Sequence, residues 1–224
     1  LTVNGSGSAI NNLAETTNIS LANTYIYARG SGSGIRSATT FDSLLAVGIE
    51  PSDGATGYTF ANADGSTTQA DMLVPRGMVI LVGSGGTGIR ANTTGKVISE
   101  GNIYITTESG GSAIVSQTAS EVVNRGDIFS WGTVSPVIDL RGGSTVFVNE
   151  GTIGAQYADT VIVAGGATDD RIALIGGAVQ GDVNTGNGTD TLTLTGGTLN
   201  GSLTMGSGID NQAFVQNVSL ANVS

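Results

Sequence analysis

The 224-residue chain lacks both histidine and cysteine. It therefore cannot form Ser-His-Asp or Cys-His catalytic groups, disulfides, or zinc sites built from imidazole or thiolate ligands. Lysine occurs once, and the 8 Lys and Arg residues stand against 18 Asp and Glu, which gives a formal net charge of −10. Such a surface repels phosphate backbones, so we expect no nucleic-acid partner. We also expect no cofactor and no metal ion.

Large side chains and long apolar runs are also scarce. Aromatic residues make up 5% of the chain. No apolar run approaches the ~20 residues that a membrane helix needs, so we expect no direct membrane insertion by these residues. Only three prolines accompany 36 glycines, which excludes collagen and proline-rich linkers. The first residues carry no signal-peptide pattern, and we expect an internal or mature piece of a longer protein.

What the sequence does contain is periodicity. Three heptapeptides of the form apolar-x-[Ser/Asn]-x-Gly-x-Ile recur at one constant interval, beginning at Val97, Val122 and Phe147. Further along the chain, apolar positions recur at a slightly shorter interval, as at Leu174 and Leu194. Intervals of roughly 20 to 25 residues are typical of solenoid proteins, in which each repeat forms one turn of a coil.

Within each repeat, apolar residues alternate over a few positions, as in Thr191–Thr195, and a Gly-Gly or Gly-x-Gly pair follows. So short a strand cannot bury its apolar face alone, but it can pair with its equivalent in the next turn. The sequence therefore predicts an all-β fold, a right-handed single-stranded parallel β-helix of about ten turns. An antiparallel sandwich would show no fixed period.

We expect residues 1–224 to form one continuous β-helix with an irregular or inserted segment at about 41–77. This segment separates two similar stretches, Tyr25–Thr40 and Val79–Thr94. The interval between them fits either two turns or one turn plus an insertion. Because loops that project from a rigid scaffold often carry function, Tyr58 and Phe60 in this segment are candidate binding residues.

The block GNGTDTLTLTGGTLNGSLTMGSGID, residues 186–210, resembles the repeats near the end of the passenger domains of Gram-negative autotransporters. The recurring heptapeptides are similar to repeats of the same proteins, so the resemblance covers residues 79–223. It implies type V secretion, either to a released form or to display at the outer membrane. It also implies a role in virulence or adhesion, and a translocating β-barrel that would lie outside these residues.

Alternation also predicts an exposed group of aromatic side chains. If Ile103 and Ile128 point into the core, Tyr104 and Phe129 lie on the outside of adjacent turns, and Trp131 follows shortly after. Exposed aromatic residues are favoured in recognition surfaces. We therefore predict a binding surface at Tyr104, Phe129 and Trp131.

Two other patterns invite a chemical interpretation. Residues 185–193 match the calcium-binding nonapeptide except at its first position, but the repeat here is much longer than a nonapeptide, which favours a simple turn. Asp169, Asp170 and Arg171 form the only adjacent acid-acid-base set, which keeps a polysaccharide-degrading enzyme open as an alternative.

A charged column is also predicted. Glu100, Arg125 and Glu150 follow the interval of the heptapeptides, so we expect them to form an acid-base-acid ladder on successive turns. Their neighbours are expected to form a partial asparagine ladder; these are Ser99, Asn124 and Asn149.

The leading hypothesis is a non-enzymatic virulence or adhesion module, secreted by or displayed on a Gram-negative bacterium. Its expected partner is a host cell-surface protein or glycan, or a component of a bacterial surface. Three alternatives stay open: a released effector that acts as a ligand for a host receptor, a polysaccharide-degrading β-helix enzyme, and a structural stalk or self-association module.

Overall fold

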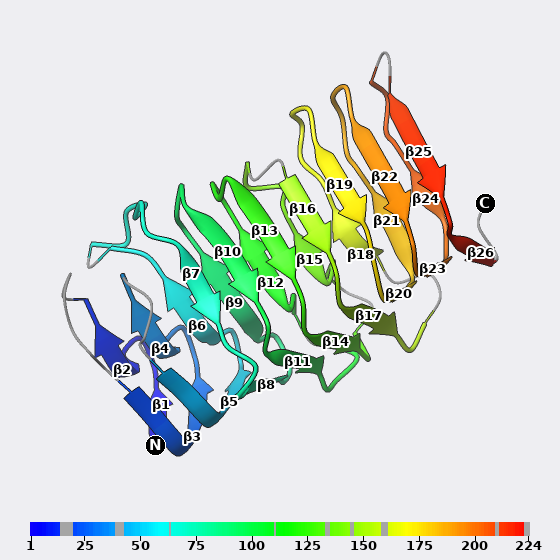
Figure 1. Ribbon diagram of the computed structural model, residues 1–224. Helices are drawn as coiled ribbons and strands as arrows, with labels where there is room; N and C mark the ends of the chain where they lie inside the picture. The colour runs from blue at the N-terminus through cyan, green and yellow to red at the C-terminus, as the bar shows by residue number, and fades with distance from the viewer. Residues whose placement is uncertain are drawn as a thin grey trace.

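The structure is a computed structural model that describes residues 1–13, 20–38, 43–62, 64–109, 111–132, 135–143, 146–157, 161–208 and 211–221. Throughout these residues the chain forms short β-strands joined by turns. The strands stack in sequence order, from the blue N-terminal end to the red C-terminal end (Figure 1). The described ranges contain no helix, and hence none that is long and apolar enough to cross a membrane.

The strands form three parallel sheets that run along the coil. The ten-stranded sheet consists, in order, of β1 (Thr2–Asn4), β3 (Ser20–Arg29), β5 (Ser43–Ser52), β8 (Met78–Val82), β11 (Asn102–Ile105), β14 (Asp127–Ser130), β17 (Thr152–Ala155), β20 (Ala178–Gln180), β23 (Thr198–Asn200) and β26 (Ser219–Ala221). The nine-stranded sheet consists of β2 (Ser8–Asn12), β4 (Ser33–Ser37), β6 (Thr56–Phe60), β9 (Thr87–Ala91), β12 (Ile114–Ser116), β15 (Ile138–Asp139), β18 (Val161–Ala164), β21 (Asp182–Asn184) and β24 (Leu203–Thr204). The seven-stranded sheet consists of β7 (Met72–Val74), β10 (Lys96–Ser99), β13 (Glu121–Asn124), β16 (Val146–Asn149), β19 (Arg171–Leu174), β22 (Thr191–Thr195) and β25 (Gln212–Gln216).

Each strand pairs with its equivalent one turn later. Ile103 in β11 pairs with Ile128 in β14, and Leu174 in β19 pairs with Leu194 in β22, as the two intervals of the sequence require. The ten-stranded sheet shows that the coil passes the same side ten times. The parallel β-helix that the repeats predict is confirmed.

Alternation along the strands decides which side chains enter the core. In the ten-stranded sheet the inward positions form one continuous aliphatic stack in which every member is buried: Ile26, Ile49, Ile80, Ile103, Ile128, Ile153, Val179 and Leu199. Burying each such side chain stabilises the fold by about 1.5–3 kcal/mol relative to leaving it in water. Because every turn covers its neighbours, no single strand has to bury its face alone.

The recurring glycine of the heptapeptides has a steric role. A Cβ on Gly126 would collide with the carbonyl oxygen of Gly101 one turn earlier, and a Cβ on Gly151 would collide with that of Gly126. Successive turns approach so closely at this corner that only glycine fits there.

The segment at about 41–77 mostly forms regular turns of the β-helix. Its strands β5, β6 and β7 are regular members of the three sheets, and Gly48 pairs with both Tyr25 and Val79. The two similar stretches that flank this segment therefore lie two turns apart. The extra length lies between β6 and β7, and it makes the turn from Ile49 to Ile80 the longest step in the aliphatic stack.

Candidate binding surface

The predicted aromatic positions lie on the outer face of the ten-stranded sheet. Ile103 and Ile128 are buried, and Tyr104 and Phe129 are paired neighbours on adjacent turns that are partly exposed. Leu81, which pairs with Tyr104 from the preceding turn, continues the column on the same face. Alternation therefore placed these side chains correctly.

Trp131 extends this group into the loop after β14. Its indole is 46% exposed and lies edge-to-face with Phe129, with ring centroids 5.5 Å apart and an interplanar angle of 69°. The backbone N–H of Trp131 donates to the carbonyl oxygen of Ile105 at 3.0 Å, which ties the loop to the turn before it. The ring is thus both exposed and held in a defined place.

A residue that follows β11 and one that follows β17 are joined across the turn that carries Trp131. The Tyr157 hydroxyl donates to Oε1 of Glu108, two turns earlier, at 2.8 Å. This hydrogen bond and the charge of Glu108 raise the pKa of the Tyr157 phenol. This hydrogen bond connects two turns beside the aromatic column.

Two further tyrosines, which sequence reasoning missed, lie on the same face near the N-terminus. Tyr25 and Tyr27 are 40% and 42% exposed, and their ring centroids are 4.9 Å apart. The Tyr25 hydroxyl donates to Oε2 of Glu50 at 3.1 Å. Partial burial and then the neighbouring Glu50 raise the pKa of Tyr25 to about 12. The sequence could have predicted that both tyrosines face outward, because Tyr25 and Tyr27 flank the inward Ile26 in an alternating strand.

Two of the aromatic rings cover glycines of the next turn. A Cβ on Gly48 would lie 2.6 Å from Cδ2 of Tyr25, and one on Gly154 would lie 3.0 Å from Cδ2 of Phe129. The rings fill space that the glycines leave open, which shields the backbone there and fixes the rings. We call the six residues of this surface the aromatic face: Tyr25, Tyr27, Leu81, Tyr104, Phe129 and Trp131.

Tyr58 and Phe60 do not belong to any surface. Both side chains are fully buried, and their rings pack edge-to-face with centroids 6.4 Å apart. They alternate with the outward Thr59 in β6, so the strand directs both rings into the core. Burial raises the pKa of the Tyr58 phenol. The expectation that these two side chains bind a partner is wrong, because neither can reach one.

Asp169 and Asp170 serve the turns of the coil. The Asp170 side chain is almost completely buried, and its Oδ2 accepts a hydrogen bond from the Gly166 N–H at 2.7 Å. Oδ1 of Asp169 accepts one from the Thr189 N–H at 2.8 Å. Burial, followed by the nearby charges of Asp190 and Asp169, raises the pKa of Asp170 to about 6.

Asp190 in the nonapeptide-like stretch uses both of its oxygens within the fold. Oδ1 accepts the Asp170 N–H at 2.9 Å, and Oδ2 accepts the Thr185 hydroxyl. In the described part of the chain, no three acidic side chains lie close enough together to hold a metal ion.

The two predicted ladders are confirmed. Arg125 contacts Oε1 of Glu100 at 3.5 Å and Oε2 of Glu150 at 2.9 Å. In the buried column beside it, Nδ2 of Asn124 donates to Oδ1 of Asn149 at 2.9 Å.

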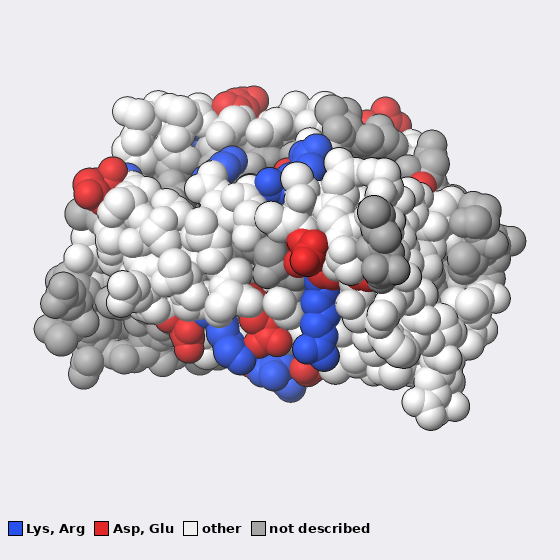
Figure 2. Space-filling model, turned by 90° about the horizontal axis from the view of Figure 1, so that it is seen from above, with Lys and Arg blue, Asp and Glu red and all other residues white. Residues whose placement is uncertain are grey.

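Most of the surface in Figure 2 carries no charge, and blue and red side chains lie next to one another at one edge. Basic side chains are thus few, and several are already paired.

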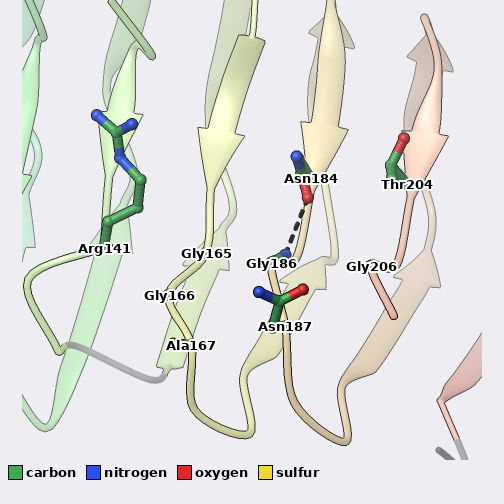
Figure 3. Close-up of a pocket in the computed structure, with 9 residues that line it drawn as sticks. All are labelled: Arg141, Gly165, Gly166, Ala167, Asn184, Gly186, Asn187, Thr204 and Gly206. Carbon is green, nitrogen blue, oxygen red and sulfur yellow. Dashed lines mark hydrogen bonds between the residues drawn. The ribbon is translucent and has the colours of Figure 1, made fainter. Parts of the chain in front are cut away.

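A hollow of about 450 Å³ lies where the nine-stranded sheet turns toward the seven-stranded sheet (Figure 3). Its polar side chains are engaged by the protein itself. Arg141 binds Asp139 through two nitrogens, at 2.9 and 2.8 Å, and Oδ1 of Asn184 accepts the Gly186 N–H at 2.9 Å. The hollow therefore follows from the glycine corners and offers little free binding capacity.

Comparison with known proteins identifies no relative. A scan against protein-family models finds no match, and neither the curated proteins nor the solved structures contain a match to this chain.

Proposed function

We propose that the protein is a non-enzymatic extracellular binding module, a fragment of the passenger domain of a Gram-negative autotransporter, that attaches to a host or bacterial surface through the aromatic face. The observation that carries the proposal is the group formed by Tyr104 and Phe129, paired on adjacent turns and partly exposed, and by Trp131, which packs on Phe129. Exposed aromatic residues are the side chains that most often dominate binding energy at protein surfaces.

The coil explains how such a face would act. Its rings are held by strand pairing, by ring contacts and by the covered glycines, so little conformational entropy is lost on contact. Glu50, which accepts the Tyr25 hydroxyl, adds a negative charge to the face, and the net charge of −10 argues against long-range attraction to the mostly anionic surfaces of cells. Affinity would come from apolar and stacking contacts with a cell-surface protein or glycan.

A binding panel tests the proposal. Beads coated with the purified protein are applied to printed arrays of cell-surface glycans and extracellular-matrix proteins and to fixed epithelial and bacterial cells. The double variant Tyr104→Ala/Trp131→Ala is compared with Phe214→Ala, which removes an aromatic side chain that is 54% exposed in β25 of another sheet. We expect the double variant to lose binding and the control to keep it; equal binding of all three proteins would refute a role for the aromatic face.

Location is tested separately in the producing cells. An antibody against residues 1–224 should detect the protein in the outer-membrane fraction or in the medium. A signal in the medium alone would favour the released effector over the displayed adhesin. A signal confined to the cytosol would contradict secretion.

A further inference from the structure

A second surface, on the nine-stranded sheet, contains two arginines in one column. Arg36 in β4 pairs with Thr59 in β6, and Thr59 pairs with Arg90 in β9. All three side chains are partly exposed on the outer face and line one groove of about 480 Å³. At the ~4.8 Å spacing of adjacent strands, the Cα atoms of the two arginines lie about 10 Å apart, so their guanidinium groups can reach one small ligand.

Ala61 and Gly65, from the extra residues between β6 and β7, form a wall of this groove. Nη2 of Arg36 donates to the carbonyl oxygen of Asn62 at 3.0 Å, which anchors the arginine to that wall. Nδ2 of Asn92 donates to the carbonyl oxygen of Gly65 at 2.9 Å, and the Thr67 hydroxyl donates to Oδ1 of Asn92 at 2.8 Å. These hydrogen bonds hold the residues between β6 and β7 against the β-helix beside the two arginines.

The groove has an excess of positive charge in a strongly acidic protein. None of the described residues that line it is Asp or Glu. The guanidinium of Arg90 makes no hydrogen bond or ion pair with any residue that the structure describes, in contrast to those of Arg125 and Arg141.

The nearest acids are already engaged. Burial disfavours the charge of Asp139, but its hydrogen bonds with Arg141 and the charges of Arg141 and Arg90 prevail and lower its pKa. Two nitrogens of Arg141 hold this carboxylate. Asp64, which lies near Arg36, accepts the Ser66 N–H at 2.9 Å. Arg90 is therefore the basic group of the groove that is left to bind an anion.

Hydroxyl and amide groups surround the two guanidinium groups. The Ser33 and Thr59 hydroxyls lie 2.7 Å apart and are hydrogen-bonded to each other, and Gln117 lines the groove from a later turn. The volume suits a ligand of one or two sugar rings. Arginine binds a carboxylate through two parallel N–H donors, and the flanking polar groups match the hydroxyls of a pyranose.

We propose that this groove binds an acidic sugar residue that carries one carboxylate, such as a hexuronic or sialic acid of a cell-surface glycan. The net charge of −10 disfavours a long polyanion such as a nucleic acid, whereas a single carboxylate needs only the local arginines. The site lies on a different sheet from the aromatic face and stands on its own geometry.

Titration of the ¹⁵N-labelled protein by NMR tests the proposal. The ligands are methyl β-glucuronide, a methyl sialoside, the neutral methyl β-glucoside and sodium acetate. We expect at least one acidic sugar to shift the backbone amides of β4, β6 and β9, and to bind about tenfold or more tightly than the glucoside, because only it carries the carboxylate. Acetate binding as strong as that of the sugars would mean a plain anion site and would overturn the assignment, as would the absence of shifts with every ligand.

Two variants and a matched control assign the effect to the groove. Arg90→Gln should weaken binding of the acidic sugar about tenfold, and Arg90→Lys, which keeps the charge but loses the planar fork, should fall between it and the parent. Arg125→Gln removes an arginine from the ladder at another corner and should leave binding unchanged. An Arg90→Gln variant that keeps the native amide spectrum and binds like the parent would refute the proposal.

The two proposed surfaces can fail independently. The double variant Tyr104→Ala/Trp131→Ala should leave the glucuronide titration unaltered, since those residues lie on the ten-stranded sheet or in the loop that follows it. Loss of sugar binding in that variant would place the ligand on the aromatic face and contradict the assignment to the groove.

Discussion

The turns near the two ends of the coil are built differently. In the ten-stranded sheet, every step of the stack between Ile26 and Ile153 is longer than the step from Val179 to Leu199. From β5 to β25, long and short turns alike nevertheless contribute a strand to all three sheets. The difference therefore lies in the connections and not in the number of strands per turn.

The connection from the ten-stranded to the nine-stranded sheet becomes much shorter between the middle of the molecule and its C-terminal end. It comprises residues 131–137 between β14 and β15 but only Gly181 between β20 and β21. Gly181 has a φ of +128°, a conformation that other residues rarely adopt. The long connections carry Trp131 and Tyr157, so the loop features of the proposed binding surface belong to the longer turns.

The core of the longer turns contains larger side chains than the core of the shorter turns. In the described core, the fully buried aromatic and methionine side chains are Tyr58, Phe60, Met72 and Met78 in the early turns, and Phe147 further along. The shorter turns are filled by valine, leucine and isoleucine, with buried aspartates at one corner. A longer turn encloses a wider space, and larger side chains are needed to fill it to normal density.

The largest expected effect comes from opening the wide core. Phe60→Ala should lower the free energy of unfolding by about 3–5 kcal/mol, because the rigid sheets cannot close around so large a cavity. Leu194→Ala in the narrow core should cost less, in the lower part of the ~2–5 kcal/mol range for such truncations. Urea denaturation followed by circular dichroism measures both. A greater loss for Leu194→Ala would contradict the proposed difference between the cores.

The tight corners of the short turns give the next largest effect. Gly201 has a φ of +152°, and a Cβ there would collide with the carbonyl oxygen of Gly181. Gly201→Ala should therefore cost about 1–3 kcal/mol through crowding, in addition to backbone strain. Gly5→Ala is the control, because Gly5 also has a positive φ but no atom within 4 Å of the added Cβ. Equal losses of unfolding free energy would show that crowding is unimportant.

The buried aspartate of the short turns should make their stability depend on pH. Because the pKa of Asp170 is raised to about 6 in the folded protein, folding favours its protonated form. The stability linked to this group is fully present below the unfolded pKa of about 4 and is lost as the pH rises through 6. Asp170→Asn should remove this part of the pH dependence and be the more stable protein at pH 8.

Denaturation midpoints measured between pH 3.5 and 8 would detect the change. Phe60→Ala, in the early turns, should keep the slope of the parent protein. An Asp170→Asn protein with the parent slope would contradict the assignment.

The smallest effect is expected from the surface ladder. Arg125→Ala should cost about 0–1 kcal/mol, because Glu100 and Glu150 are partly exposed to water and salt. The loss should shrink further when the denaturation is repeated in 0.5 M NaCl, about three times the physiological ionic strength. A cost that exceeds that of Gly201→Ala would show that ion pairs, and not close turn packing, hold the coil together.

The fold was predictable wherever the repeats were regular. The pairs Ile103 with Ile128 and Leu174 with Leu194 follow from constant intervals, since equal spacing makes residues neighbours in a coil. In the last turn the interval grows by a single residue, so Leu194 pairs with Val215 and not with Phe214. One inserted residue reverses which side chains face inward, and this left Phe214 outside the core.

The binding surfaces were less predictable because they depend on turns of irregular length. Tyr58 and Phe60 were misplaced since no repeat crosses that segment, and only the paired strands reveal that Thr59 is the outward residue. The arginine groove did leave a trace: the same Gly-Ile-Arg triplet ends at Arg36 and at Arg90 in the two similar stretches. The sequence did not reveal that Thr59 lies between the two arginines on a single intervening turn, so the repeated triplet alone could not show that Arg36 and Arg90 are close in space.

Each turn pairs only with its immediate neighbours. The number of turns in the β-helix can therefore change without changing how the remaining turns pair. A gene could gain or lose one whole period, such as residues 103–127, and the flanking strands would still meet matching edges. The cross-section and the core chemistry would be preserved while the rod grew or shrank by one strand width. Distance between two surface features is thus open to evolutionary adjustment without any redesign of the interior.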